Sequence, residues 1–561
     1  MRPVFKIRVR PEPGPRPRPA SRHPGRRRQA ETRTSACPHI PEGAGQLPNR
    51  RGWTLALTCA AIFMLVLDTT IVAVALSDMQ RDLNASLASL QWVVDGYTLP
   101  LAAFLLPTAS LGDRIGRRPL FMAGLAVFTV SSMACALAPT SAALGVFRAV
   151  QGLGGAALFG VAVPLIADVY PAGRARDLAI GVFGAFSGAA VAVGPLAGGV
   201  LTELFGWRAI FWLNVPIGGA ALALSGWALA RTGRGTRGPL KLDWAGMALC
   251  TSSLFLLVLG CIEGPSWGWA HPRTVTVFAG AALGCALFVL VELRVSDPMM
   301  DLRLFLAPHY TAGAAVGFVL QATLVASTTY LSLYVQNVLG FSALDTGLRF
   351  LPFSLAAFAS AALVAPLLAR VRAAWLVGGT AAGAALGLEL IAFGPAAHYS
   401  ELLPGFVVCG IALGTGTTVL NRVTVTGIAK DRVGAASGTG VALRQAGVTI
   451  GVAVLGIIYH YVAREQVRSE LGALDDSAAD LVADSVAAGS GTQAAAVVPP
   501  GPLRDTVTDA AARASVAGLD GVLHSGAALA ALTALVAFTV LLRRPGHRVE
   551  EAAAEPTTAS R

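Results

Sequence analysis

Fourteen blocks of about 20 apolar residues divide most of this chain, and each block is as long as a helix that crosses a bilayer. Of the 561 residues, 54% are hydrophobic and only 13% are charged, whereas soluble domains carry about 25% charged residues. This composition excludes an ordinary soluble enzyme and a nucleic-acid-binding protein. The sequence predicts an all-α polytopic membrane protein whose two termini lie on the same side. The expected spans are 53–77, 90–111, 119–138, 142–167, 178–202, 209–230, 244–262, 274–291, 311–335, 346–369, 373–394, 402–426, 433–462 and 521–542.

The net charge of +11 lies almost entirely in the N-terminal tail. Residues 1–51 hold thirteen of the 43 Lys and Arg residues and three of the 32 acidic residues, so the rest of the chain carries a net charge of only +1. An Arg- and Pro-rich segment of this kind has too little apolar surface to fold. We therefore expect residues 1–52 to be a disordered basic tail, or the product of a start codon placed too far upstream.

The distribution of Lys and Arg in the loops predicts the orientation. Loops after even-numbered spans carry fifteen of these residues and the short loops after odd-numbered spans carry four, which places both termini in the cytoplasm. Residues 231–243 and 543–561 are then a cytoplasmic linker and a cytoplasmic tail. Residues 463–520, rich in Ala, Gly and Ser, are expected to form a weakly ordered outer loop. No soluble segment is large enough for a catalytic site, so we expect no enzyme activity.

The loop after the second span has a specific pattern of charge and glycine. It reads Gly112-Asp113-Arg114-Ile115-Gly116-Arg117-Arg118-Pro119. A generic basic loop does not require Asp and Gly at these places. The loop resembles the GxLaDRxGRR signature of the major facilitator superfamily, with Ala109 at the first Gly. The resemblance implies that Asp113, Arg114, Gly116, Arg117 and Arg118 form a loop that switches with conformation.

Three further runs resemble the fourteen-span drug:proton antiporters of that superfamily, the EmrB/QacA type. Residues 67–76 are similar to LDxTIVNVALP, with Ala73 in place of the usual Asn. Residues 148–155 are similar to RxxQGxG, and residues 206–218 to the WRxIFxxNVPIG run. The resemblance implies two six-helix bundles, 53–230 and 292–542, with two extra helices, 244–291, between them. It also implies a substrate site near the midplane and alternating access by rocking.

The fifth span carries a glycine pattern similar to the antiporter motif GxxxGPxxGG, with Ala190 at the first Gly. The residues concerned are Gly184, Gly188, Gly194, Pro195, Gly198 and Gly199. Pairs of small residues four apart permit close helix approach, and proline removes a backbone donor and bends the helix. Ordinary packing explains the pattern as well, but the resemblance implies an occluding gate against leak.

Three ionisable residues fall within spans at comparable depth in the outer half. Asp68, Asp95 and Arg148 lie roughly 13, 8 and 9 Å from the outer ends of their spans at about 1.5 Å per residue. Such groups are costly in a membrane and usually line a cavity or pair. Protonation of either acid would change its pairing with Arg148, which predicts a proton-coupling switch. The alternatives are a structural ion pair and, for Asp95, solvation near the interface.

Four polar residues within spans are candidates for the substrate cavity: Gln151, Gln321, Arg444 and Gln445. A structural hydrogen-bonding role is the alternative. No metal-binding spacing and no phosphate-binding loop occurs, so the proton motive force is the expected energy source and no cofactor is expected.

The leading hypothesis is proton-driven export of amphipathic organic compounds, such as drugs or antibiotics, by a monomer in the bacterial cytoplasmic membrane. The intramembrane acids favour cationic substrates unless Arg148 neutralises one of them. Symport of a small metabolite is the alternative within transport, against which the antiporter motif argues. A membrane sensor without transport is the alternative of another class.

Overall fold

The computed structural model describes residues 50–171, 173–229, 243–295, 298–364, 371–392, 399–423, 433–471 and 502–542, and these form helices without any strand. The predicted tails 1–52 and 543–561 and the linker 231–243 fall almost wholly outside the described residues. The helices are α1 (Arg50–Leu83), α2 (Leu87–Ile115), α3 (Arg117–Ala136), α4 (Ser141–Val169), α5 (Arg174–Phe205), α6 (Arg208–Trp212), α7 (Asn214–Ala228), α8 (Trp244–Trp267), α9 (Pro272–Arg294), the 3-10 helix η1 (Leu302–Leu306), α10 (Pro308–Leu320), the π-helix η2 (Gln321–Val325), α11 (Ala326–Asn337), α12 (Ala343–Val364), α13 (Ala373–Ala392), α14 (Tyr399–Val423), α15 (Val433–Leu471) and α18 (Pro502–Leu542).

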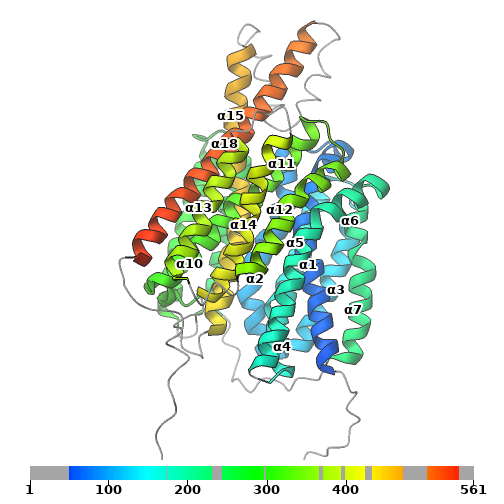
Figure 1. The fold of residues 1–561 in the computed structure, drawn as a ribbon, viewed down its shortest axis with the longest axis vertical. Helices are drawn as coiled ribbons and strands as arrows, with labels where there is room; N and C mark the ends of the chain where they lie inside the picture. Colours follow the sequence, from blue (N-terminus) through cyan, green and yellow to red (C-terminus); the bar gives the residue numbers. More distant parts are fainter. Residues whose placement is uncertain are drawn as a thin grey trace, which may run out of the picture. The chain divides into compact units, whose positions relative to one another are not determined.

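Each predicted span corresponds to one helix or to one helical run, so the all-α polytopic prediction is confirmed. Thirteen helical segments among the described residues are long and apolar enough to cross a membrane. The helix α2 is the span-length helix outside that set, and it carries the polar residues Gln91, Asp95 and Thr98, all buried. We call the end of the bundle that holds Arg50 and Gly116 the lower end and the end that holds Leu83 the upper end (Figure 1).

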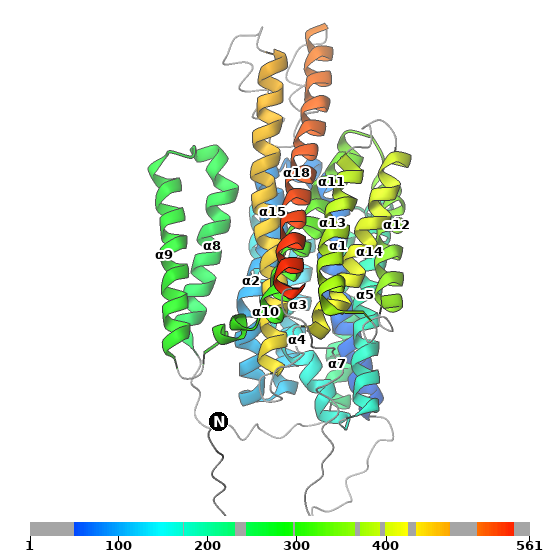
Figure 2. The ribbon, with the colours of Figure 1, turned by 60° about the vertical axis from the view of Figure 1, so that its left-hand side comes forward.

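The helices form two bundles and a separate hairpin. In the first half α4 packs on α2 and α3, and α1 packs on α5. In the second half α13 packs on α14 and α18, while α12 packs on α14 and α15 packs on α18. The hairpin α8–α9 is central in the sequence but lies at the side of the molecule (Figure 2). Its helix α8 packs on α2 and α15, one from each half.

The two halves meet along α5 with α12, α2 with α15, and α1 with α11. Small residues allow the backbones to approach: a Cβ at Gly199 would lie 2.6 Å from the carbonyl oxygen of Ala343. Near the upper end Gln336 donates to the carbonyl oxygen of Val74 at 2.8 Å. Contacts between the last turns of α1 and α5 and the adjoining ends of α11 and α12 therefore join the halves at the upper end.

The prediction of a weakly ordered loop over 463–520 is wrong for much of that segment. The helix α15 continues to Leu471 and α18 begins at Pro502; residues 472–501 lie outside the described residues. We call 463–471 and 502–520 the stalk, which rises from the upper end in both views (Figures 1 and 2). Its two helices share a buried seam of small and aliphatic side chains at helical spacing. The seam consists of Ala463, Val467, Leu471, Val507, Ala510 and Ala514.

An ion pair between Arg513 and Glu470, with nitrogen and oxygen 2.8 Å apart, also joins the stalk helices. Alanine is the best helix former, so the Ala-rich composition that suggested a loop is equally compatible with helix. Packing against the partner helix decides whether such a segment forms a helix or a loop.

Candidate transport site

A buried ion pair lies in the first half, between α1 and α4. Arg148 donates from Nη1 to Asp68 Oδ2, and both side chains are at most 1% exposed. Arg148 also donates from Nε to the carbonyl oxygen of Val93 at 3.1 Å. Its guanidinium lies 4.2 Å from the ring centroid of Tyr97. The sequence places Asp68 and Arg148 at comparable depth, and in the structure the two side chains are in direct contact; their role in proton coupling stays a prediction.

Two amides complete the coordination of Asp68. Gln151 and Asn214 each donate a side-chain N–H to Asp68 Oδ1 at 3.0 Å. Gln151 also accepts from Arg148 Nη1 at 3.0 Å, and Asn214 donates to Ser132 Oγ at 3.1 Å. An anion that accepts a charged and two neutral hydrogen bonds is stabilised as an anion. We call Asp68, Arg148, Gln151 and Asn214 the charge cluster.

Sequence reasoning missed Asn214 as a site residue. It begins α7, and it lies in the 206–218 run that carried the family resemblance, so the signal was present without an assigned role. Gln151 does not line the central cavity in this conformation, and a cavity role for it stays a prediction. Its side chain is 0% exposed because both of its polar atoms bind within the charge cluster.

Asp95 is not part of the charge cluster. It is 0% exposed, so solvation near the interface, the alternative reading of this residue, does not occur in this structure. Thr98 Oγ1 lies 3.4 Å from Asp95 Oδ1, and Asp95 Oδ2 has no hydrogen-bond partner. Thr449 on α15 donates to Thr98 at 2.8 Å. Asp95 is therefore an unpaired buried carboxyl, connected through two hydroxyls to the second half.

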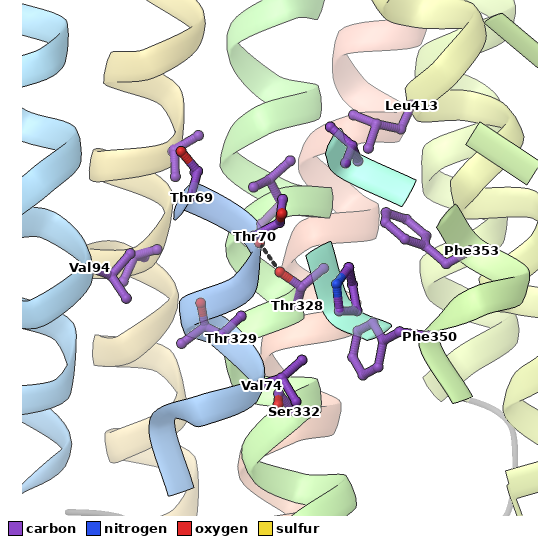
Figure 3. A pocket seen from close by; sticks show the side chains of 16 residues that line it. Thr69, Thr70, Val74, Val94, Thr328, Thr329, Ser332, Phe350, Phe353 and Leu413 are labelled. Carbon is purple, nitrogen blue, oxygen red and sulfur yellow. Dashed lines mark hydrogen bonds between the residues drawn. The ribbon is translucent and has the colours of Figure 1, made fainter. Parts of the chain in front are cut away.

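A central cavity of about 50 Å³ lies between the halves, beside the charge cluster on α1. Figure 3 shows Thr69, Thr70 and Val74 facing side chains of α11 and α12 across it. The lining consists of hydroxyl, aliphatic and aromatic groups and contains no charged side chain. The residues are Thr69, Thr70, Ala73, Val74, Val94, Val191, Pro195, Val325, Thr328, Thr329, Ser332, Phe350, Phe353, Leu413, Val448 and Val452.

The other predicted cavity residues lie away from this lining. Arg444 is partly exposed and donates to Asn421 Oδ1 at 3.0 Å, which links α15 to α14. Gln445 is also partly exposed. Gln321 begins the π-helix, and its buried Oε1 has no hydrogen-bond partner. A cavity role for Gln321, Arg444 and Gln445 stays a prediction.

The lower turn between α2 and α3 is built on Gly116, whose φ of 107° suits glycine. Asp113 and Arg114 lie in the last turn of α2, and their side chains are outside the described part of the chain. Arg117 pairs with Asp168 at the end of α4 and donates to the carbonyl oxygen of Pro164 at 3.0 Å. Arg118 donates to the carbonyl oxygen of Gly226 on α7. The two arginines therefore hold the lower ends of three helices together.

The glycine pattern of α5 separates into two parts. A Cβ at Gly194 would overlap Thr70 Oγ1, and one at Gly198 would lie 2.8 Å from the carbonyl oxygen of Ile71. Close approach of α5 to α1 is therefore present there. A Cβ at Gly184 would meet no described atom within 4 Å, and one at Gly188 would lie 3.7 Å from Phe358, so these two glycines make no close helix approach in this conformation. Ala179 and Phe183 in the same part of α5 are nevertheless buried against α1 and α4.

A second hollow, of about 990 Å³, opens at the upper end between the last turns of α1, α5 and α11. Asp82 on α1 pairs there with Arg208 and accepts from Trp207 Nε1 at 3.0 Å. Arg208 also lies 4.3 Å from the ring centroid of Trp207. The short helix α6 is thus tied to the end of α1.

Comparisons with known proteins agree with this architecture. The family profile described as the Major Facilitator Superfamily matches residues 58–452. The Multidrug resistance protein Stp of Mycobacterium tuberculosis (strain CDC 1551 / Oshkosh) is 36% identical over 409 residues, which cover 72% of this chain and 75% of that protein. The Tetracenomycin C resistance and export protein of Streptomyces glaucescens is 34% identical over 426 residues, 74% of this chain and 78% of the relative. The Cephamycin export protein CmcT of Amycolatopsis lactamdurans is 37% identical over 405 residues, 72% and 83% of the two chains.

A solved structure shares the fold at low identity. The crystal structure of a bacterial homolog to the human lysosomal transporter Spinster, in an inward-facing and unoccupied conformation, superposes with a TM-score of 0.62. It is 17% identical, and the match covers 90% of this chain and all of that one. The likeness concerns the arrangement of helices.

Proposed function

Because this chain belongs to the Major Facilitator Superfamily, we propose that it exports amphipathic organic compounds across the bacterial cytoplasmic membrane in exchange for protons. It is a multi-pass membrane transporter and not an enzyme. The printed names of the relatives support drug or antibiotic export, since they are resistance and export proteins. The loop charges support an orientation in which the lower end and both termini face the cytoplasm.

The observation that supports proton coupling is the fully buried charge cluster beside the central cavity. The same helix, α1, presents Thr69 and Thr70 to the cavity and Asp68 to Arg148. Protonation of Asp68 would remove the negative charge that binds Arg148 and both amides. The contacts that fix α1 to α4 and α7 would weaken, and the cavity wall on α1 would be free to move.

The upper-end contacts support the sequence of events. In this state the halves are joined at the upper end, and Asp68 is paired with Arg148. We propose that opening of the upper end exposes Asp68 to protons from outside, and that return to the present state restores the Arg148 pair and releases the proton to the cytoplasm. Rocking of the two halves about the midplane site is the motion that such folds use.

Asp95 is the proposed second proton carrier. An unpaired carboxyl that is fully buried is far less costly in its neutral form, so Asp95 is expected to hold a proton in this state. Asp95 contacts Thr98, which accepts a hydrogen bond from Thr449 of the second half. Gain or loss of this proton would therefore change the contact between α2 and α15. The roles of the α2–α3 turn and of the α5 glycines as switch and seal are likewise proposals that these contacts support.

The substrate is proposed to be a small lipophilic molecule without a full positive charge. The cavity lining offers hydroxyls and the rings of Phe350 and Phe353 but no acid. The nearest acid on α1, Asp68, is neutralised by Arg148. These features favour uncharged aromatic compounds with hydrogen-bonding groups over the cationic substrates that the intramembrane acids alone had suggested. We propose that the monomer is sufficient, since the charge cluster and the cavity each lie within one chain.

The test is transport in proteoliposomes with an imposed pH gradient. Uncharged and cationic fluorescent dyes of similar size would be compared, with a protonophore as the control. Uphill transport that stops with the protonophore supports proton antiport. Transport that runs with the proton gradient in the same direction would point to symport, and a preference for the cationic dyes would refute the proposed substrate class.

A further inference from the structure

Two carboxyl groups meet at the lower end of the hairpin α8–α9, outside the site described above. Asp243 caps α8, and its Oδ1 accepts from the backbone N–H of Gly246 at 2.7 Å. Glu292 lies in the last turns of α9, and its Oε2 accepts from the backbone N–H of Met300 at 3.1 Å. Each carboxyl therefore uses one oxygen to accept a hydrogen bond from a nearby backbone N–H group.

The second oxygen of each carboxyl faces the other carboxyl. Asp243 Oδ2 and Glu292 Oε1 are both buried and have no hydrogen-bond partner in the part of the chain that the structure describes. Both lie within 3.0 Å of the place that a Cβ of Gly246 would occupy, so they are less than about 6 Å apart. Glu292 as a whole is only 4% exposed.

Among the described residues, neither acid takes part in an ion pair. Other titratable groups in this part of the hairpin are Cys250 on α8, which lies close enough to Glu292 and Cys285 to feel their charge, and Arg294 in the last turn of α9. Asp301, in the turn that follows, accepts from the backbone N–H of Arg303.

We propose that Asp243 and Glu292 share one proton and form a pH-sensitive clasp at the base of the extra hairpin. Two ionised carboxylates at this separation repel each other and leave two buried oxygens without donors. One shared proton removes the repulsion, because the protonated acid donates to the carboxylate. A bound metal ion is disfavoured, because Ca²⁺ requires about six to eight oxygens and only two carboxyl oxygens converge here.

The clasp ties together the chain segments that connect the hairpin to the two halves. Asp243 is the last residue of the predicted linker from the first half, and Met300 lies in the connection from α9 through η1 to α10. Loss of the shared proton would separate these two segments and loosen the hairpin, whose α8 packs on both halves. The orientation proposed above places the clasp at the cytoplasmic surface, so it would respond to cytoplasmic pH.

Infrared spectroscopy of the purified full-length chain in nanodiscs tests the clasp without any transport measurement. In an Asp95→Asn background, which removes the other buried carboxyl proposed to hold a proton, the chain should show a carboxylic acid C=O absorption that disappears as the pH is raised. Glu292→Gln and Asp243→Asn should each lose this absorption, because the carboxamide donates to the remaining carboxylate and replaces the proton. Gly246→Ala retains both acids but forces them apart, and should shift the pH midpoint by at least one unit, a tenfold change in proton affinity.

Glu263→Gln is the matched control, since Glu263 lies on the same helix but binds Trp92 near the upper end. It should leave the absorption unchanged. The clasp is refuted if the absorption persists in either carboxamide variant, or if wild-type protein binds Ca²⁺ or Mg²⁺ at a site that either variant abolishes. Should one variant fail to fold, as judged by size-exclusion chromatography, the other suffices, because either carboxamide alone must remove the shared proton.

Discussion

Replacement of Asp68 by Asn should destabilise the protein and abolish proton coupling, and these two effects can be separated. Asparagine has the shape of aspartate and keeps an oxygen that can accept from Gln151 and Asn214. Toward Arg148 it presents either its amide N–H group or a neutral oxygen in place of a charged carboxylate oxygen. The guanidinium, 1% exposed, then keeps only neutral acceptors. Removal of one partner of a buried ion pair typically costs about 3–5 kcal/mol, and we expect a loss of stability in that range.

The double variant Asp68→Asn/Arg148→Gln distinguishes the structural cost from the functional one. It removes the unpaired charge, so it should recover much of the lost stability, measured as the midpoint of thermal unfolding in detergent. It cannot bind a proton at position 68 and should remain unable to drive transport with a pH gradient. Asp68→Glu should retain partial coupling, because it can still ionise.

Two results would refute this reasoning. Uphill transport by Asp68→Asn at the wild-type rate would show that the ion pair is structural, and Asp95 would become the leading proton carrier. A double variant no more stable than the single one would show that the cost does not arise from an uncompensated Arg148. Both measurements use the same purified protein, so expression differences do not enter.

The remaining predictions concern packing, the charge cluster and orientation. Gly194→Ala should block transport by forcing α5 from α1, whereas the matched variant Gly184→Ala should be near neutral because its Cβ meets nothing within 4 Å; dye efflux at equal expression checks both. Asn214→Ala leaves Ser132 without this donor and Asp68 one donor short, so it should cost about 1–3 kcal/mol in thermal unfolding and shift the pH profile of transport; an unchanged profile would show that Asn214 does not act through Asp68. Alkaline phosphatase fused after Arg548 should be inactive in cells, and an active fusion would overturn the proposed orientation.

The helices could be predicted from the sequence because the bilayer imposes a length on every apolar block. The pairing of Asp68 with Arg148 was also within reach, since residue count along a helix gives depth. Depth does not give rotation about the helix axis. Asp95 lies at similar depth, yet it points away from Arg148 toward α8 and α15, and no count of residues distinguishes the two acids.

Contacts between spans that are far apart in the sequence could not be predicted from residue counts along each helix. Asn214 and Gln151 reach Asp68 from 146 and 83 positions away, and those meetings depend on how three helices pack. The close approach at Gly194 and its absence at Gly184 differ for the same reason, because the sequence pattern is alike at both places and only the neighbouring helix differs. The stalk was missed because alanine-rich sequence becomes helix or loop according to what it packs against.

The stalk also amplifies any tilting movement of the second half. The 39 residues of α15 and the 41 of α18 correspond to helices about 60 Å long, roughly twice the thickness of the hydrocarbon layer. These helices run unbroken from the bundle into the stalk, so a tilt of the second half about the midplane moves the free end of the stalk about three times as far as a point at the membrane surface. A fluorophore pair with one dye on Arg513 and one near Arg81 would therefore read the transport cycle as a change in distance, with an amplification that the fold itself supplies.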